Sequence, residues 1–179
     1  MNSIFLVEVA NFSCPYCRAM SRWHDHLETA VRQYGGAFRF APISLSEHND
    51  TRELIYYGAR QLGAEAAERV KEALYRGAQD DQLPMETEAQ VLEFLGRAPS
   101  TRTFNLAQLQ VAARSEEARE AHQRALRLAH MARVNLLPSY VFIQDGRPVY
   151  TLERHDDQPV GSAFRGRIEA KLKELGENQ

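Results

Sequence analysis

The pattern of apolar and polar residues near the N-terminus predicts three elements. The apolar run 4–9 predicts a buried strand, the segment 14–33 a helix, and the segment 38–43 a second strand. Pro42 indicates an edge strand or a strand terminus, because proline has no N–H to donate to a neighbouring strand. The chain therefore begins with the order strand, helix, strand.

The middle of the chain has a helical period almost throughout residues 49–134. Glycine and proline interrupt this period, which predicts four to five short helices. A strand pattern returns at 139–143, turns at an Asp-Gly pair and continues at 149–152, as is typical of a hairpin. A last helix is predicted for about residues 161–175.

This order of elements predicts an α/β, thioredoxin-like fold with an inserted all-helical domain. Residues 1–48 and 135–179 would form the thioredoxin-like domain, and residues 49–134 the insertion. Two parallel strands joined by a helix require a right-handed crossover. The loop after the first strand therefore lies at the carboxyl end of the sheet, where α/β folds present their functional sites.

That loop contains the only two cysteines of the chain, in the sequence Cys14-Pro15-Tyr16-Cys17. A cysteine at a helix N-terminus has its thiolate stabilised by free N–H groups and the helix dipole. We expect Cys14 to be this attacking thiol and Cys17, one turn further on, to be the more buried resolving thiol. The pair could instead bind a metal or be inert. A CxxC without a second pair of ligands is weak evidence for zinc, so we expect no metal.

Three segments resemble the DsbA family of thiol:disulfide oxidoreductases: residues 6–17, 58–63 and 137–142. The resemblance covers nearly the whole chain and implies the fold and activity of that family. It also implies that Pro138 follows a cis peptide bond opposite the cysteine pair, where the backbone at Leu137 pairs with an extended substrate. The alternative is an ordinary trans proline that begins a strand, since only about 5–6% of such bonds are cis.

Glu8 is an acidic residue in a strand that otherwise has the composition of a core. A buried carboxylate is costly unless it is paired or protonated. The resemblance implies that Glu8 accepts the proton of the resolving thiol. The alternative is a glutamate at the end of a strand, whose side chain reaches solvent.

Residues around the motif are candidates for substrate binding. We expect this role for Leu137, Pro15, Tyr16 and Phe12, although Phe12 could equally pack in the core. The Pro-Tyr pair between the cysteines differs from the Pro-His pair of the most oxidising family members. We therefore expect a weaker oxidant than those members, but a stronger one than thioredoxin. His24 and His26 lie two residues apart on a helix and make a poor metal pair.

The net charge of −2 argues against nucleic acid as a partner. No apolar stretch is long enough for a membrane span. No signal peptide is recognisable, and this does not distinguish a mature exported protein from a cytosolic protein, because both lack one. We expect a monomeric oxidase without a cofactor that introduces disulfides into exported proteins. Its partners would be unfolded or folding proteins with cysteines and a DsbB-like membrane reoxidant, and it would be periplasmic. The alternatives are a reductase or isomerase, possibly cytoplasmic, and a non-enzymatic metal-binding module.

Overall fold

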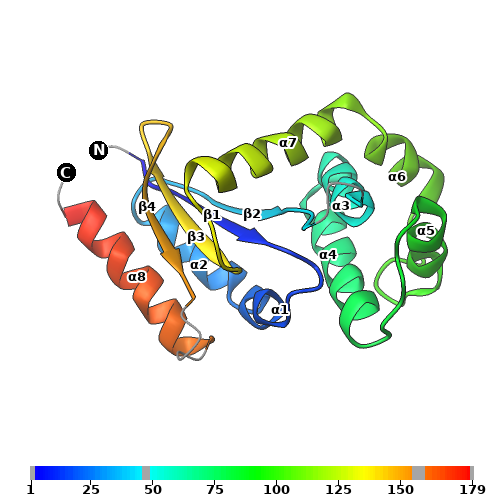
Figure 1. Ribbon diagram of the computed structural model, residues 1–179, viewed down its shortest axis with the longest axis horizontal. Coiled ribbons are helices and arrows are strands. Elements are labelled where there is room, and N and C mark those ends of the chain that lie inside the picture. The colour runs from blue at the N-terminus through cyan, green and yellow to red at the C-terminus, as the bar shows by residue number, and fades with distance from the viewer. Residues whose placement is uncertain (1–2, 46–48, 155–159, 178–179) are drawn as a thin grey trace. The chain divides into compact units, whose positions relative to one another are not determined.

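The computed structural model describes residues 3–45, 49–154 and 160–177 (Figure 1). Its elements in chain order are β1 (Phe5–Ala10), α1 (Pro15–Ser21), α2 (His24–Arg32), β2 (Phe38–Pro42), α3 (Thr51–Leu62), α4 (Ala64–Gln79), α5 (Glu88–Arg97), α6 (Leu106–Ala113), α7 (Glu116–Met131), β3 (Ser139–Gln144), β4 (Arg147–Glu153) and α8 (Ser162–Glu177). This is the predicted α/β order with helices inserted after β2. None of the helices within the described residues is long and apolar enough to cross a membrane.

The chain divides into two compact units. One comprises Met1–Pro42 and Arg127–Gln179 and holds the sheet, and the other comprises Ile43–Leu126 and is helical. The second division falls inside α7, earlier than the residue 134 used in the sequence analysis. The chain just after α7 is bound to β4, because Thr151 Oγ1 donates a hydrogen bond to the Ala132 carbonyl at 3.1 Å.

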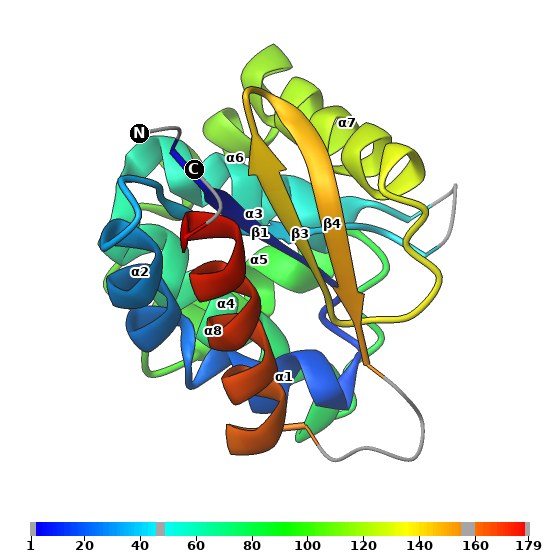
Figure 2. The same ribbon diagram turned by 90° about the vertical axis from the view of Figure 1, so that its left-hand side faces the viewer.

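The four strands form one sheet in the order β2-β1-β3-β4 (Figure 2). β1 runs parallel to β2 and antiparallel to β3, and β3 and β4 form an antiparallel hairpin. β2 lies at the edge of the sheet and ends at Pro42, which confirms the prediction from that proline. Since β1 and β2 are parallel, the loop after β1 lies at the carboxyl end of both strands.

One face of the sheet is covered by α2 and α8, which lie side by side (Figures 1 and 2). Residues paired in register on neighbouring strands point to the same face. The residues that share this face are Leu6, Glu8, Phe38, Phe40, Tyr140 and Phe142. The Tyr140 ring packs edge-on against Phe164 of α8, with 5.6 Å between centroids. Glu8 therefore lies on the covered, apolar face of the sheet.

The segment 14–33, predicted as one helix, forms two helices with a break at Trp23. Ser21 Oγ donates a hydrogen bond to the Arg18 carbonyl at 2.7 Å, and the Trp23 N–H donates to the Met20 carbonyl at 2.9 Å. Such bonds to carbonyls three residues back compete with helical hydrogen bonds and end α1. The stripe of buried positions continues across the break as Cys17, Met20, His24, Leu27 and Val31.

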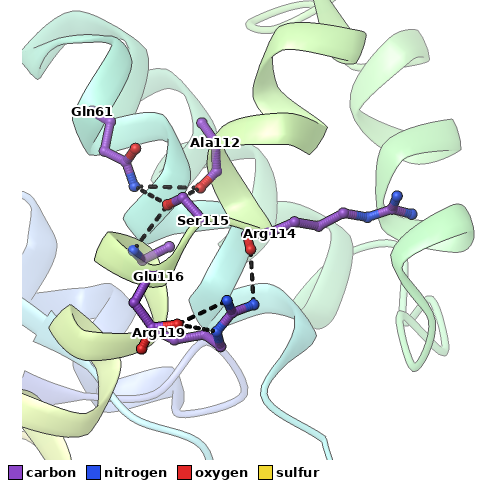
Figure 3. A network of polar contacts seen from close by, with 7 residues as sticks. Gln61, Ala112, Arg114, Ser115, Glu116 and Arg119 are labelled. Carbon is purple, nitrogen blue, oxygen red and sulfur yellow. Dashed lines mark hydrogen bonds and ion pairs between the residues drawn. The ribbon is translucent and has the colours of Figure 1, made fainter.

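In the helical unit, α3 and α6 approach closely. A Cβ placed on Gly58 of α3 would lie 2.5 Å from the Ala113 nitrogen, so only glycine permits this approach. Polar contacts join the end of α3 to the corner between α6 and α7 (Figure 3). Gln61 Nε2 donates to Ser115 Oγ at 2.8 Å, and this hydroxyl accepts the Ala118 N–H at 3.1 Å. Ser115 thereby caps α7.

Candidate active site

Cys14 is the N-cap residue of α1. Its backbone is extended, with φ −85° and ψ 112°, and its Sγ accepts the Cys17 N–H at 3.2 Å. Pro15 begins the helix, where a missing N–H costs nothing. The buried Asn11 shapes the loop before it, because its carbonyl accepts the Cys14 N–H at 3.1 Å and its Oδ1 accepts the Ser13 N–H at 2.8 Å. The Cys14 sulfur is thus held at the helix N-terminus and is half-buried.

The two thiols have opposite electrostatic environments. The hydrogen bond from the Cys17 side chain, together with the N–H groups of Cys17 and Tyr16, lowers the pKa of Cys14 below its ordinary value, although burial and the Glu8 charge oppose this. Burial raises the pKa of Cys17 far above its ordinary value, and contacts with Cys14 and the Glu8 charge add to the effect. Cys17 is fully buried. Cys14 is therefore the thiolate that can attack, and Cys17 the thiol that keeps its proton.

The loop before β3 lies against the cysteine pair. The Leu137–Pro138 peptide bond is cis. The Leu137 carbonyl oxygen is 3.7 Å from Cys14 Sγ and accepts a hydrogen bond from its S–H group. Pro138 is buried, whereas Leu137 is partly exposed. The structure thus brings together residues that lie 123 positions apart in the chain.

The candidate substrate-binding residues differ in exposure. Pro15 is exposed, and Tyr16 is 43% exposed, with the Arg154 guanidinium 4.0 Å above its ring centroid. Phe12 is fully buried, and its ring packs edge-on against Phe40 at 6.1 Å between centroids. The expectation that Phe12 contacts substrate is therefore wrong: its ring fills the core beneath the loop. No sequence pattern around Arg154 predicts that it contacts the Tyr16 ring.

Glu8 is fully buried and does not reach solvent. Its Oε2 lies 2.6 Å from His24 Nε2, while its Oε1 has no hydrogen-bond partner among the described residues. The His24 ring packs against Phe38 and Phe40, with 4.9 and 5.3 Å between centroids. Sequence reasoning missed this partner. The available signal was that His24 follows Cys17 by seven residues, two helical turns, and so shares its face.

His26 lies on the surface instead, where its Nε2 is 2.5 Å from Glu169 Oε1. The two histidines therefore point to different partners. No group of three or more His, Cys, Asp or Glu side chains that could hold a metal ion occurs within residues 3–45, 49–154 and 160–177.

No protein-family model matches the chain, and no curated protein matches its sequence. Solved structures of DsbA proteins match its fold. Pseudomonas aeruginosa DsbA has a TM-score of 0.73 at 17% identity, over 98% of this chain and 83% of that chain. The oxidoreductase NmDsbA1 from Neisseria meningitidis has a TM-score of 0.70 at 13% identity, over 98% and 86%. Proteus mirabilis DsbA with a non-covalently bound peptide has a TM-score of 0.70 at 15% identity, over 99% and 90%.

Proposed function

We propose that this chain, which has the fold of the DsbA proteins, is a protein thiol:disulfide oxidoreductase that exchanges a Cys14–Cys17 disulfide with cysteine pairs of substrate proteins. The observation that carries the proposal is the asymmetry of the pair. Cys14 is half-buried at a helix N-terminus with a lowered pKa, and Cys17 is fully buried one turn away. An inert pair has no need of this arrangement, whereas disulfide exchange depends on one accessible thiolate.

In the proposed cycle, a substrate thiolate attacks Cys14 Sγ of the oxidised pair. The Cys14–Cys17 bond breaks, Cys17 leaves with the electron pair and takes up a proton, and a mixed disulfide forms at Cys14. A second substrate thiolate then attacks the substrate sulfur of this mixed disulfide. Cys14 leaves as a thiolate, the substrate is oxidised and the pair is reduced. The low pKa of Cys14 makes it a good leaving group in this second step.

The surface beside Cys14 supports binding of an extended peptide. The structure of Proteus mirabilis DsbA contains a non-covalently bound peptide. In this chain, the Leu137 carbonyl lies 3.7 Å from Cys14 Sγ, and the side chains of Pro15 and Tyr16 are exposed. We propose that a substrate strand contacts Leu137, Pro138, Pro15 and Tyr16. Backbone pairing of this kind gives affinity without strict sequence preference.

We propose oxidation of exported proteins as the direction of the reaction. The stabilised Cys14 thiolate favours the reduced form of the pair, and a pair that prefers to be reduced is an oxidant. Such an enzyme works in an oxidising compartment, here proposed to be the periplasm. Regeneration of the disulfide then requires an electron acceptor, proposed to be a membrane protein of the DsbB type.

The reduction potential of the pair tests this proposal. The protein is equilibrated in glutathione buffers, its free thiols are alkylated, and the two forms are quantified by mass spectrometry. We expect a value between about −120 and −180 mV, the range from DsbA to protein disulfide isomerase. A value near about −270 mV would indicate a thioredoxin-like reductant and reverse the proposed direction.

Two variants test the activity itself. Cys17→Ser, incubated with oxidised glutathione, should accumulate a mixed disulfide at Cys14, because Cys14 displaces one glutathione thiolate and no second thiol of the chain displaces the other. Cys14→Ser should form none, because Cys17 is fully buried. If the wild type instead retains stoichiometric zinc or copper and forms no disulfide, the pair binds metal and the proposed function is wrong.

A further inference from the structure

Two polar side chains interrupt the apolar layer between β1 and α2. Glu8 of β1 is 0% exposed and His24 of α2 is 6% exposed, and Glu8 Oε2 lies 2.6 Å from His24 Nε2. A buried charge is costly unless it is paired, and replacing such a pair by apolar residues is often stabilising. Stability alone therefore does not account for this pair, and His24 shares its buried helix face with Cys17, which points to a chemical role.

The surroundings of the pair are apolar except on the side of the cysteines. β2 presents the rings of Phe38 and Phe40, both in contact with the His24 ring. β3 presents Tyr140, which is opposite Glu8 in register, and this ring packs on Phe164 of α8. Titratable groups on the elements around the pair include the Tyr140 hydroxyl and the thiols of Cys14 and Cys17. Of these, the thiols react.

The two carboxyl oxygens of Glu8 have different surroundings. Oε2 is bonded to His24, and Oε1 is buried without a hydrogen-bond partner among the described residues. The Glu8 charge acts on both Cys14 and Cys17. The carboxyl group therefore has a buried acceptor without a hydrogen-bond partner among the described residues, and its charge acts on the fully buried Cys17 thiol.

We propose that His24 is a positioning residue that acts through Glu8, the acid to which the resemblance assigns the proton of Cys17: His24 orients the Glu8 carboxyl group and connects it to solvent. The inference rests on the proposed function and extends it to a residue outside the cysteine motif. When Cys17 leaves as a thiolate, it takes a proton from the pair, which recovers one from solvent through His24. When Cys17 attacks a mixed disulfide at Cys14, the pair accepts its proton and the partner sulfur leaves with the electron pair.

His24 has a definite task in this scheme. Glu8 has no exposed surface of its own, whereas His24 is slightly exposed and has a second ring nitrogen. An imidazole that binds Glu8 through Nε2 holds the carboxyl group in one orientation. It also connects the carboxyl group to the outside of the core. A glutamine at position 24 could donate the same hydrogen bond but could not transfer a proton.

The test follows closure of the disulfide in the full chain with oxidised glutathione. Cys14 first attacks glutathione to give a mixed disulfide, and Cys17 then displaces the second glutathione thiolate. Acid quenching, alkylation and mass spectrometry resolve the two steps over a range of pH. We expect His24→Gln to slow the second step at least about tenfold and to change its pH dependence, since acid–base catalysis contributes factors of this size. The rate of the first step should change at least fivefold less than the rate of the second step.

His26→Gln is the matched control, because His26 also binds a glutamate, at 2.5 Å, but on the surface. It should leave both steps unchanged. The double variant Glu8→Gln/His24→Gln should close no more than about twofold more slowly than Glu8→Gln alone, because His24 acts through Glu8. If the slowing in the double variant instead equals the product of the slowing in the two single variants, the two residues act independently and the proposal is wrong.

Two further outcomes separate the inferences. If His24→Gln closes with the rate and pH profile of the wild type, this proposal is wrong while the proposed function stands. If the wild type itself forms neither the mixed disulfide nor the disulfide, the proposed function fails first. Should His24→Gln not fold, His24→Asn takes its place, because it also cannot transfer a proton: a slower second step with a changed pH dependence supports the proposal, and a rate and pH profile like the wild type overturns it.

Discussion

Glu53 of α3 is a second fully buried carboxyl group, in the helical unit. Burial raises its pKa to about 7, although the Arg52 charge acts in the opposite direction. Glu8, in contrast, lies in the unit that contains the cysteines and is bonded to His24. Burial alone therefore does not distinguish Glu8 from Glu53, and the role proposed for Glu8 rests on its neighbours.

The Glu53 carboxyl group should make stability depend on pH. Its pKa is about 7 when folded and 4.5 as an ordinary glutamate, so the folded protein binds more protons than the unfolded chain between these values. The unfolding free energy should therefore fall as the pH rises through this window, by up to about 3 kcal/mol. Urea unfolding of Glu53→Gln at about pH 5 and pH 8 should show a smaller decrease than the wild type. The exposed Glu65, replaced by Gln, is the control, and an equal decrease in both variants would contradict the assignment.

At the scale of elements, two helical glycines differ in what surrounds them. Gly58 of α3 meets the α6 backbone, where a Cβ would lie 2.5 Å from the Ala113 nitrogen, whereas Gly166 of α8 has open space. Alanine favours a helix over glycine by about 1 kcal/mol at both positions. We expect Gly166→Ala to stabilise the protein by about 0.5–1 kcal/mol. Gly58→Ala should destabilise it by about 1–3 kcal/mol, because a backbone contact cannot yield. Chemical unfolding of both variants measures the difference, and equal effects would show that α3 and α6 are not in close contact.

The order of the elements could be predicted because each strand and helix has its own apolar period. The break between α1 and α2 could not, because it depends on the hydrogen bond from Ser21 Oγ to the Arg18 carbonyl and not on glycine or proline. The sequence alone did not distinguish whether Phe12 or Tyr16 is exposed at the site. Only the packing against Phe40 separates the buried Phe12 from the exposed Tyr16. Local patterns therefore predicted the elements, and their packing decided which side chains form the site.

At the scale of the whole molecule, the residues proposed to carry out disulfide exchange all belong to the unit that contains the sheet. Cys14 precedes the helical insertion and Leu137 follows it, yet both lie within this unit. The cysteine pair and Glu8 could be identified from sequence because they are adjacent to one strand. The spacing from Cys17 places His24 on the buried helix face, but its contact with Glu8 depends on the packing of α2 against β1.

The oxidation state of the pair should change the stability of the whole fold. The folded protein lowers the pKa of Cys14 and so stabilises the reduced form, whereas the unfolded chain does not. We expect the reduced protein to be more stable than the oxidised protein by about 1–3 kcal/mol near neutral pH, equivalent to about 20–65 mV. For a lowered pKa this advantage is present above the unfolded pKa and is lost as the pH falls through the folded pKa.

Urea unfolding with and without reductant measures this difference. The double variant Cys14→Ser/Cys17→Ser should show no effect of reductant. A more stable oxidised form, or a difference that grows on acidification, would contradict the stabilisation of the Cys14 thiolate.

Trp23, at the break between α1 and α2, is the only tryptophan of the chain. The Arg165 guanidinium lies 4.4 Å above its ring, and its Nε1 is buried without a hydrogen-bond partner among the described residues. All tryptophan fluorescence of the protein therefore originates six positions after Cys17, at the joint of the helix that carries the cysteines. Trp23 is thus an intrinsic fluorescent reporter at the break between α1 and α2, and its emission can be recorded without an attached dye.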